Sequence, residues 1–269
     1  MSRIAISAFS GWNDAGEAAS GVVEHLLEVW PSHQIGWIDG EEFMDFQVNR
    51  PLISTGEDLS RTITWPGTRL DLLEVPEGPP VVLLHGPEPS LRWRAFADRV
   101  VAELLGADVD LLISLGALLT DSPHTRPLPV GVSREPETDE PAEEGLYEGP
   151  IGMPTVLARA AATRGLPTES MWVQVPHYVA QNASPKAVLG LLREVQEHVA
   201  CPIPLGDLEE EAAAWEHGVD ELARTDPDIA DYVARLEKAK DASELPEASG
   251  DAIAREFEQF LRRRRRDER

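Results

Sequence analysis

Several polar side chains whose types could perform acid–base chemistry stand just after apolar runs of this chain. A carboxylate beside an imidazole can take up and return a proton, and a neighbouring guanidinium can hold an anionic group. The segment 121–126 offers all three types within six residues. The catalytic candidates are Asp14, His85, Asp121, His124 and Arg126, and the candidates for a binding cleft are Asn13, Asp14, Glu88, His177 and Tyr178.

Each candidate also has a purely structural interpretation. Asp14 fits the start of a helix, where a carboxylate caps backbone N–H groups. His85 fits a turn, and the segment 121–126 fits a polar network that fixes a loop. A metal site would require Asp14, His85, Asp121 and His124 to meet. We therefore assign no metal and no catalytic residue, and the residues above remain candidates.

The glycine-containing segment 11–17 has the strand-to-helix position of a phosphate-binding loop but lacks the residues of one. A Walker A loop places Lys and Ser or Thr after its last glycine, and here Glu17 follows Gly16. The lysines of the chain are Lys186, Lys238 and Lys240, so residues 1–185 contain none. We expect no tight ATP binding and no cofactor.

The elements that must position these residues follow an α/β pattern, because short apolar runs alternate with amphipathic helical stretches. Strands are predicted over 4–9, 35–38, 80–84, 111–115 and 172–175, and helices over 17–30, 90–105, 154–164 and 185–199. Ser90 is predicted to cap the second helix. Residues 41–56 are predicted to form a loop, and 61–64 to pair with 69–75 as a hairpin.

The carboxyl ends of parallel strands meet at one edge of a sheet, and ligands bind there. We therefore expect the candidates to converge on one rim. In particular, His124 and Arg126 should lie close to Asp14 or Asp121.

Composition changes after residue 202. We predict an α/β core domain over 1–204, an acidic helical hairpin over 205–242 packed on that core, and a linker with a basic C-terminal helix over 243–269. The last segment contains Arg262–Arg266, whose expected partners are acids of this chain or of a sister subunit.

Charge and cysteine content restrict the partners and the compartment. The formal net charge is −24 at pH 7, which disfavours binding to nucleic acid and to anionic lipid surfaces. The single cysteine, Cys201, cannot form an internal disulfide and favours a reducing compartment. No apolar run approaches the roughly 18 residues of a membrane span. We expect a cytoplasmic protein without nucleic-acid or membrane partners.

Five sequence blocks resemble the signature of the proteasome-assembly-chaperone-like family of bacteria and archaea. In chain order they are Gly11–Ala19, Glu42–Pro51, Leu84–Pro89, Leu115–Pro127 and Val175–Tyr178. The resemblance implies a three-layer α/β/α core similar to the phosphorylase/hydrolase-like fold. It also implies homo-oligomers of three to five subunits, with a trimer as our specific expectation, and a protein partner such as proteasome subunits.

Two departures from the family pattern concern function. Archaeal relatives that bind proteasome rings resemble one another in a C-terminal hydrophobic-Tyr-any tail, whereas this sequence ends in Arg266-Asp-Glu-Arg269. Some relatives are labelled ATP-grasp-type carboxylate-amine ligases. Such enzymes resemble one another in placing lysines on the nucleotide phosphates, which residues 1–185 do not offer.

We therefore predict a non-catalytic, homo-oligomeric assembly or interaction protein. The alternative is a hydrolase- or phosphorylase-type enzyme that acts on a small molecule at the carboxyl rim of the sheet. A flat, well-packed rim favours the first hypothesis. Convergence of the candidate side chains within about 4 Å in a cleft favours the second.

Overall fold

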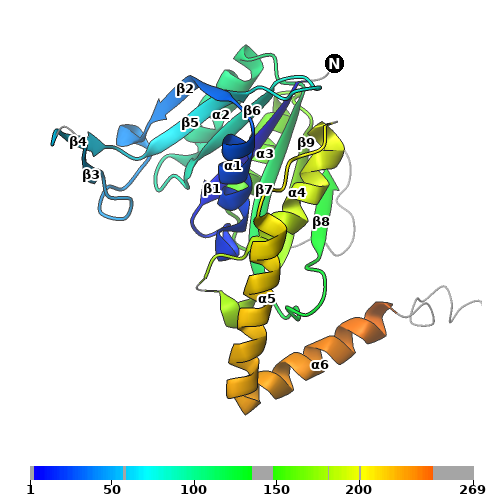
Figure 1. Ribbon diagram of the computed structural model, residues 1–269. Coiled ribbons are helices and arrows are strands. Elements are labelled where there is room, and N and C mark those ends of the chain that lie inside the picture. Colours follow the sequence, from blue (N-terminus) through cyan, green and yellow to red (C-terminus); the bar gives the residue numbers. More distant parts are fainter. Residues whose placement is uncertain (1–2, 57–58, 135–147, 181, 200, 245–269) are drawn as a thin grey trace, which may run out of the picture.

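A mixed seven-stranded sheet forms the centre of the computed structural model, which describes residues 3–244 except 57–58, 135–147, 181 and 200 (Figure 1). In spatial order its strands are β2 (Ser32–Asp39), β5 (Gly67–Leu73), β6 (Val81–Pro87), β1 (Ile4–Ser10), β7 (Leu111–Thr120), β9 (Thr168–Pro176) and β8 (Val130–Arg134). The four strands β6, β1, β7 and β9 are parallel, and β2, β5 and β8 pair antiparallel with their neighbours. The carboxyl ends of the four central strands therefore share one edge.

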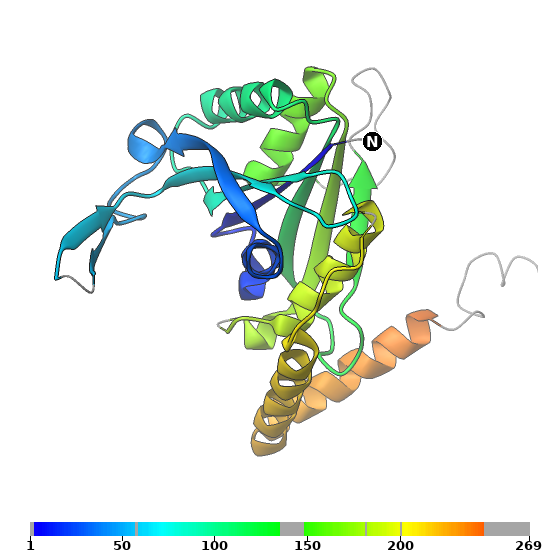
Figure 2. The same ribbon diagram turned by 45° about the horizontal axis from the view of Figure 1, so that its top comes forward.

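Two pairs of helices cover the sheet and complete a three-layer α/β/α arrangement, which confirms the predicted fold class (Figure 2). One face carries α1 (Ala18–Val29) and α4 (Pro185–Val199), and the other carries α2 (Trp93–Gly106) and α3 (Met153–Thr163).

Side-chain alternation along β1 produces the two cores. Ile4 and Ile6 join the cluster under α1 and α4, whereas Ala5 and Phe9 join the cluster under α2 and α3. This two-residue period is that of a strand with both faces buried.

Two further helices extend from the core, α5 (Leu208–Thr225) and α6 (Pro227–Glu244) (Figure 1). Leu208 and Ala212 of α5 join the core under α1 and α4. The basic C-terminal helix predicted from residue 253 and the arginine run lie outside the described residues. Within the described ranges, no helix is long and apolar enough to cross a membrane.

Three short 3-10 helices occur in the connections of the described residues. They are η1 (Ala15–Glu17), η2 (Gly40–Glu42) and η3 (His177–Val179). The first and the third follow the carboxyl ends of β1 and β9 and so belong to the edge where the site candidates were predicted.

The predicted hairpin between residues 61–64 and 69–75 is wrong. β4 (Arg61–Thr64) pairs with β3 (Leu52–Thr55) as a separate two-stranded sheet, and β5 lies between β2 and β6. The reason is burial. Leu70, Asp71 and Leu73 of β5 are all buried, and the backbone of such a strand requires a hydrogen-bonded neighbouring strand on each edge. β4 is thus left to pair with part of the segment 41–56 that was predicted as a loop.

Two smaller features also differ from prediction. Ser90 does not cap α2, because the helix begins only at Trp93 and its N-cap position is Arg92, which makes no side-chain capping hydrogen bond. Arg92, the residue before the helix, has a left-handed backbone with φ of 53°. The edge strand β8 was not predicted, since its five residues carry no continuous apolar pattern.

Candidate functional site

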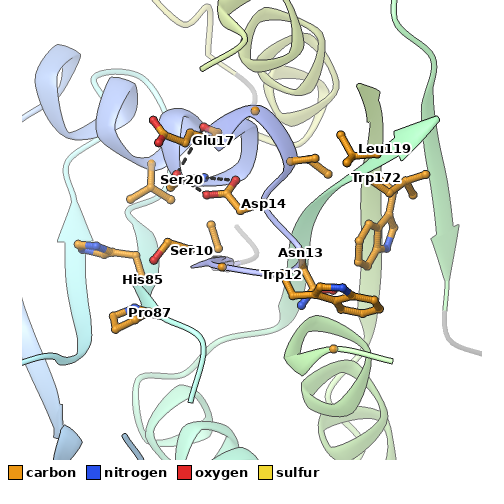
Figure 3. Close-up of a pocket in the computed structure, with 18 of the residues that line it drawn as sticks. Ser10, Trp12, Asn13, Asp14, Glu17, Ser20, His85, Pro87, Leu119 and Trp172 are labelled. Carbon is orange, nitrogen blue, oxygen red and sulfur yellow. Dashed lines mark hydrogen bonds between the residues drawn. The ribbon is translucent and has the colours of Figure 1, made fainter. Parts of the chain in front are cut away.

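A cleft of about 1480 Å³ opens at the carboxyl ends of β1, β6 and β7 (Figure 3). The turn 11–17 between β1 and α1 forms one wall, and residues 150–152 before α3 contribute to another. Of the residues singled out in the sequence, Asn13, Asp14 and His85 line this cleft.

The turn 11–17 is held rigidly against its neighbours. Gly11 and Gly16 have φ of +129° and +61°, which favours glycine, and a Cβ on Gly16 would lie 3.0 Å from the Cβ of Ser184. The backbone N–H of Ser184 donates to the carbonyl of Gly16 at 2.7 Å, and that of Ala117 donates to the carbonyl of Asn13 at 2.7 Å. The turn is therefore joined both to β7 and to the start of α4.

Asp14 caps the first turn of α1. Its Oδ1 accepts from the backbone N–H groups of Ala19 at 2.7 Å and Ser20 at 3.2 Å, and its Oδ2 accepts from the Ser20 hydroxyl at 2.5 Å (Figure 3). Burial raises the pKa of this carboxyl above its ordinary value of 3.8, and the hydrogen bonds from Ser20 and Ala19 oppose the rise. The carboxylate thus accepts hydrogen bonds from the first turn of α1 and stabilises the N-terminus of this helix.

Asn13 and Glu88 form a second structural contact beside the cleft. The side-chain amide of Asn13 and the backbone N–H of Met153 both donate to Oε1 of Glu88 at 2.7 Å. The backbone N–H of Glu88 donates to the carbonyl of Ser10 at 2.9 Å. One carboxylate therefore joins the ends of β1 and β6 to the N-terminus of α3.

His85 lies within β6, opposite Arg69 of β5, and not in a turn. Its Nε2 is 2.9 Å from Oδ2 of Asp71, whose carboxylate is fully buried. The guanidinium of Arg69 also donates to Asp71, with Nε 2.7 Å from Oδ2. A buried carboxylate requires such partners, and the imidazole supplies one of its hydrogen bonds.

His124 lies away from this cleft, in a buried position on the loop after β7. Its Nδ1 is 2.8 Å from the hydroxyl of Tyr178, and its Nε2 is 3.0 Å from Oδ1 of Asp220 on α5. The backbone N–H of His124 donates to the same hydroxyl at 2.8 Å. Because a carboxylate only accepts, Nε2 carries a proton and donates it to Asp220. Burial raises the pKa of Tyr178 to about 12.

Neighbouring residues of the same loop bind α6. Asp121 accepts from the hydroxyl of Tyr232 at 2.8 Å and lies 3.3 Å from Nδ1 of His177. Arg126 donates two hydrogen bonds of 2.9 Å to Asp241 and contacts Glu237 at 3.3 Å. The hydrogen bond from Arg126 lowers the pKa of Asp241.

The structure therefore separates the candidates into two groups. The cleft group consists of Asn13, Asp14 and His85, with Glu88 bound to Asn13. The anchor group, which fastens α5 and α6 to the core, consists of Asp121, His124, Arg126, His177 and Tyr178. His124 and Arg126 are directed toward α5 and α6, whereas Asp14 is directed toward α1.

Sequence reasoning missed most partners of the anchor group. They are Asp220, Tyr232, Glu237 and Asp241, together with Lys186, which donates to the carbonyl of His124 and to Glu216. Contacts such as these span 30 to 115 residues, so no short spacing rule could have found them. The acidic faces of the two predicted helices were the available signal.

The mouth of the cleft is apolar and acidic. Trp12 is 67% exposed there, beside Leu118, Leu119 and Ile151, which are also exposed. Glu17 and Glu24 contribute the exposed carboxylates. Among the described residues that line the cleft, none is Lys or Arg. Within the described part of the chain, no three His, Cys, Asp or Glu side chains are grouped as metal ligands would be.

Comparisons with known proteins agree on one family. Residues 8–223 match the model of the PAC2 family. The crystal structure of a PAC2 family protein from Streptomyces avermitilis is similar with a TM-score of 0.76 and 42% identity, covering 86% of this chain and 99% of that one. A proteasome-assembly chaperone homologue from Mycobacterium tuberculosis gives a TM-score of 0.77 and 40% identity over the same shares.

A more distant structure shares the fold alone. An archaeal proteasome activator from Pyrococcus furiosus is similar with a TM-score of 0.59 and 14% identity, covering 82% of this chain and 93% of that one. Among curated proteins, none matches the chain.

Proposed function

The chain belongs to the PAC2 family, and on that premise we propose that it is a non-catalytic, homo-oligomeric assembly protein that binds a protein partner. The relatives described as a proteasome-assembly chaperone homologue and a proteasome activator support proteasome subunits as that partner. We further propose that residues 1–204 form the core domain and that the hairpin 205–242 is an appendage fastened by the anchor group.

The observation that carries this proposal is that the polar candidates make structural contacts, whereas large apolar side chains are exposed. The polar candidates are committed to structural contacts: Asp14 caps a helix, His85 pairs with Asp71, and His124 binds α5. Large apolar side chains, in contrast, are exposed around the cleft and on the β3–β4 sheet. Exposed apolar patches of this kind mark protein-binding surfaces.

An enzyme at the rim receives less support. That hypothesis requires Asp14, His85, Asp121, His124 and Arg126 around one substrate, but the anchor group binds α5 and α6 while Asp14 and His85 face the cleft. The acidic cleft is also a poor site for a phosphorylated substrate, since carboxylates repel phosphate.

Two measurements test the proposal. Sedimentation velocity at tens of micromolar, at low and at high salt, should show an oligomer that persists as salt screens the repulsion between acidic subunits. Purified proteasome α- and β-subunits from an organism that carries this chain should co-elute with it and assemble faster in its presence. A monomer in both salts would refute the oligomer, and unchanged assembly without co-elution would refute the partner.

A further inference from the structure

The β3–β4 sheet stands away from the rest of the molecule (Figures 1 and 2). We call its described residues, 48–56 and 59–65, the arm. Its two strands pair only with each other, and all eight strand residues are exposed. Trp65 at the base packs on the ring of Phe46, but an isolated two-stranded hairpin is marginally stable at best in water. A partner surface that covers the arm would remove this weakness.

The arm carries a concentrated set of exposed apolar side chains. Ile53 and Ile63 lie directly opposite each other in the register and are 55% and 52% exposed. Leu52 is 71% exposed, and Val48 and Trp65 at the base of the arm are exposed as well. Only isolated exposed apolar residues occur on the helices, such as Leu105 and Leu222. Among the described residues, the arm is thus an apolar surface that protrudes from the rest of the molecule.

The cleft is the complementary concave surface of the same chain. Its mouth presents Trp12, Leu119 and Ile151 as exposed apolar side chains. Its volume of about 1480 Å³ exceeds the roughly 300–1,000 Å³ of pockets that enclose small ligands. It is therefore large enough for a segment of polypeptide. No described residue of the arm lines the cleft of its own chain.

Charge does not oppose the pairing of these two surfaces. Residues 48–65 contain two exposed cations, Arg50 and Arg61, and two acids, Glu57 and Asp58, which lie outside the described residues, so this segment has no net charge. The cleft carries the exposed carboxylates of Glu17 and Glu24, without Lys or Arg among its described lining. In a chain of net charge −24, the arm can approach another copy without meeting the like-charge repulsion that opposes other contacts.

We propose that the arm of one copy docks into the cleft of a second copy of this chain. The inference rests on the self-association proposed above and specifies the surfaces that produce it. Because arm and cleft are different surfaces, the contact is heterologous, and repeating it either closes a ring or continues into a filament. A ring is consistent with the family's expected small number of subunits.

Sedimentation velocity on full-length variants tests the contact. The arm variant carries Ile53→Asp and Ile63→Asp, and the cleft variant carries Trp12→Asp. The matched control is Leu222→Asp, because Leu222 is 53% exposed on α5 and distant in sequence from both surfaces. We expect the control to associate like the wild type. Each test variant should have an association constant at least tenfold lower and should sediment as a monomer.

Mixing the two variants distinguishes a heterologous contact from any other. The mixture contains one intact cleft and one intact arm, so it should form a 1:1 dimer and nothing larger. Two arms that pair with each other would give no complex on mixing. Arg61→Glu should weaken wild-type association severalfold at low salt and less at high salt.

The outcomes that overturn the inference are separable from failure of the proposed function. If the wild type is an oligomer and either variant remains one, or the mixture gives no dimer, the arm–cleft contact is wrong while self-association stands. If the wild type is a monomer, the arm–cleft contact and the proposed self-association are both wrong. Circular dichroism checks the fold of each variant, and replacing residues 52–64 with a short Gly-Ser linker gives a second arm variant, which removes only exposed side chains among the described residues.

Discussion

The buried imidazole of His124 joins the α/β core to α5 through the carboxylate of Asp220. Nε2 of His124 lies 3.0 Å from Oδ1 of Asp220, although 96 residues separate the two in the sequence. The His124 side chain is 1% exposed, whereas the Asp220 side chain is 46% exposed. Because the hydroxyl of Tyr178 occupies Nδ1, Asp220 supplies the partner that the buried Nε2–H requires.

Removing this acceptor should destabilise the attachment of α5. Asp220→Ala leaves a buried N–H without its partner, which costs about 1–3 kcal/mol in the free energy of unfolding. Asp220→Asn keeps an acceptor oxygen and should cost less. Denaturant unfolding measures the change, and limited proteolysis should show faster cleavage within α5 and α6. The matched control is Asp231→Ala at an exposed position on α6. Equal stability of D220A and D231A would contradict the assigned role.

Tyr178 should titrate well above the ordinary tyrosine pKa of 10.0. Burial raises its pKa from 10.0 to about 12, because the phenolate would lose hydration. The folded state therefore favours the protonated form. Its contribution to stability is complete below pH 10 and is lost as the pH rises toward 12. Ultraviolet difference titration of the wild type against Tyr178→Phe isolates this group, and a midpoint near 10 would show that the phenol is solvated.

Asp14 should contribute to stability as a helix cap. Asp14→Ala removes the acceptor for Ala19 and Ser20 and should cost about 0.5–2 kcal/mol, while Asp14→Asn should cost less. Burial raises the pKa of Asp14 above 3.8, so ionisation of this carboxyl is less favourable in the folded chain than in the unfolded chain. The stability of the wild type relative to D14N should therefore fall as the pH rises from 3.8 through the folded-state pKa. A constant difference measured by denaturant unfolding at each pH would contradict this.

Local patterns predicted the central layers of the fold well. The amphipathic stretch 185–199 reappears as α4 over the same residues, and the apolar run 111–115 reappears as β7, which extends to Thr120. A strand that is buried on both faces has a continuous apolar run, whichever strands and helices pack against it. The pairing of β4 could not be predicted in this way. Its residues are exposed, so its sequence has no apolar pattern that indicates which strand lies beside it.

The candidate residues were harder to interpret than the strands. Proximity to a strand end correctly placed Asn13 and Asp14 at the cleft, because the parallel strands dictate that edge. It failed to show that His124 and Tyr178 face a helical appendage, since the helices that bind them come later in the chain. Polar residue types indicate that partners are needed, but the topology decides which partners they meet.

A glycine beside the cleft provides the last prediction. Gly152 packs directly against Asn13, and a Cβ at this position would collide with the Asn13 side-chain amide. Gly152→Ala must therefore displace Asn13 from Glu88 and disturb the start of α3, which Glu88 also binds. We expect a loss of about 1–3 kcal/mol in the free energy of unfolding, as for other overpacked sites.

The matched control for this variant is Gly218→Ala within α5, where a Cβ would have nothing within 4 Å. A helix-interior glycine is less favourable than alanine by roughly 0.5–1 kcal/mol, so G218A should stabilise the protein. The two substitutions add the same methyl group and should move the denaturation midpoint in opposite directions. If G152A were neutral, Asn13 would be free to move, and the contact between Asn13 and Glu88 would not constrain the start of α3.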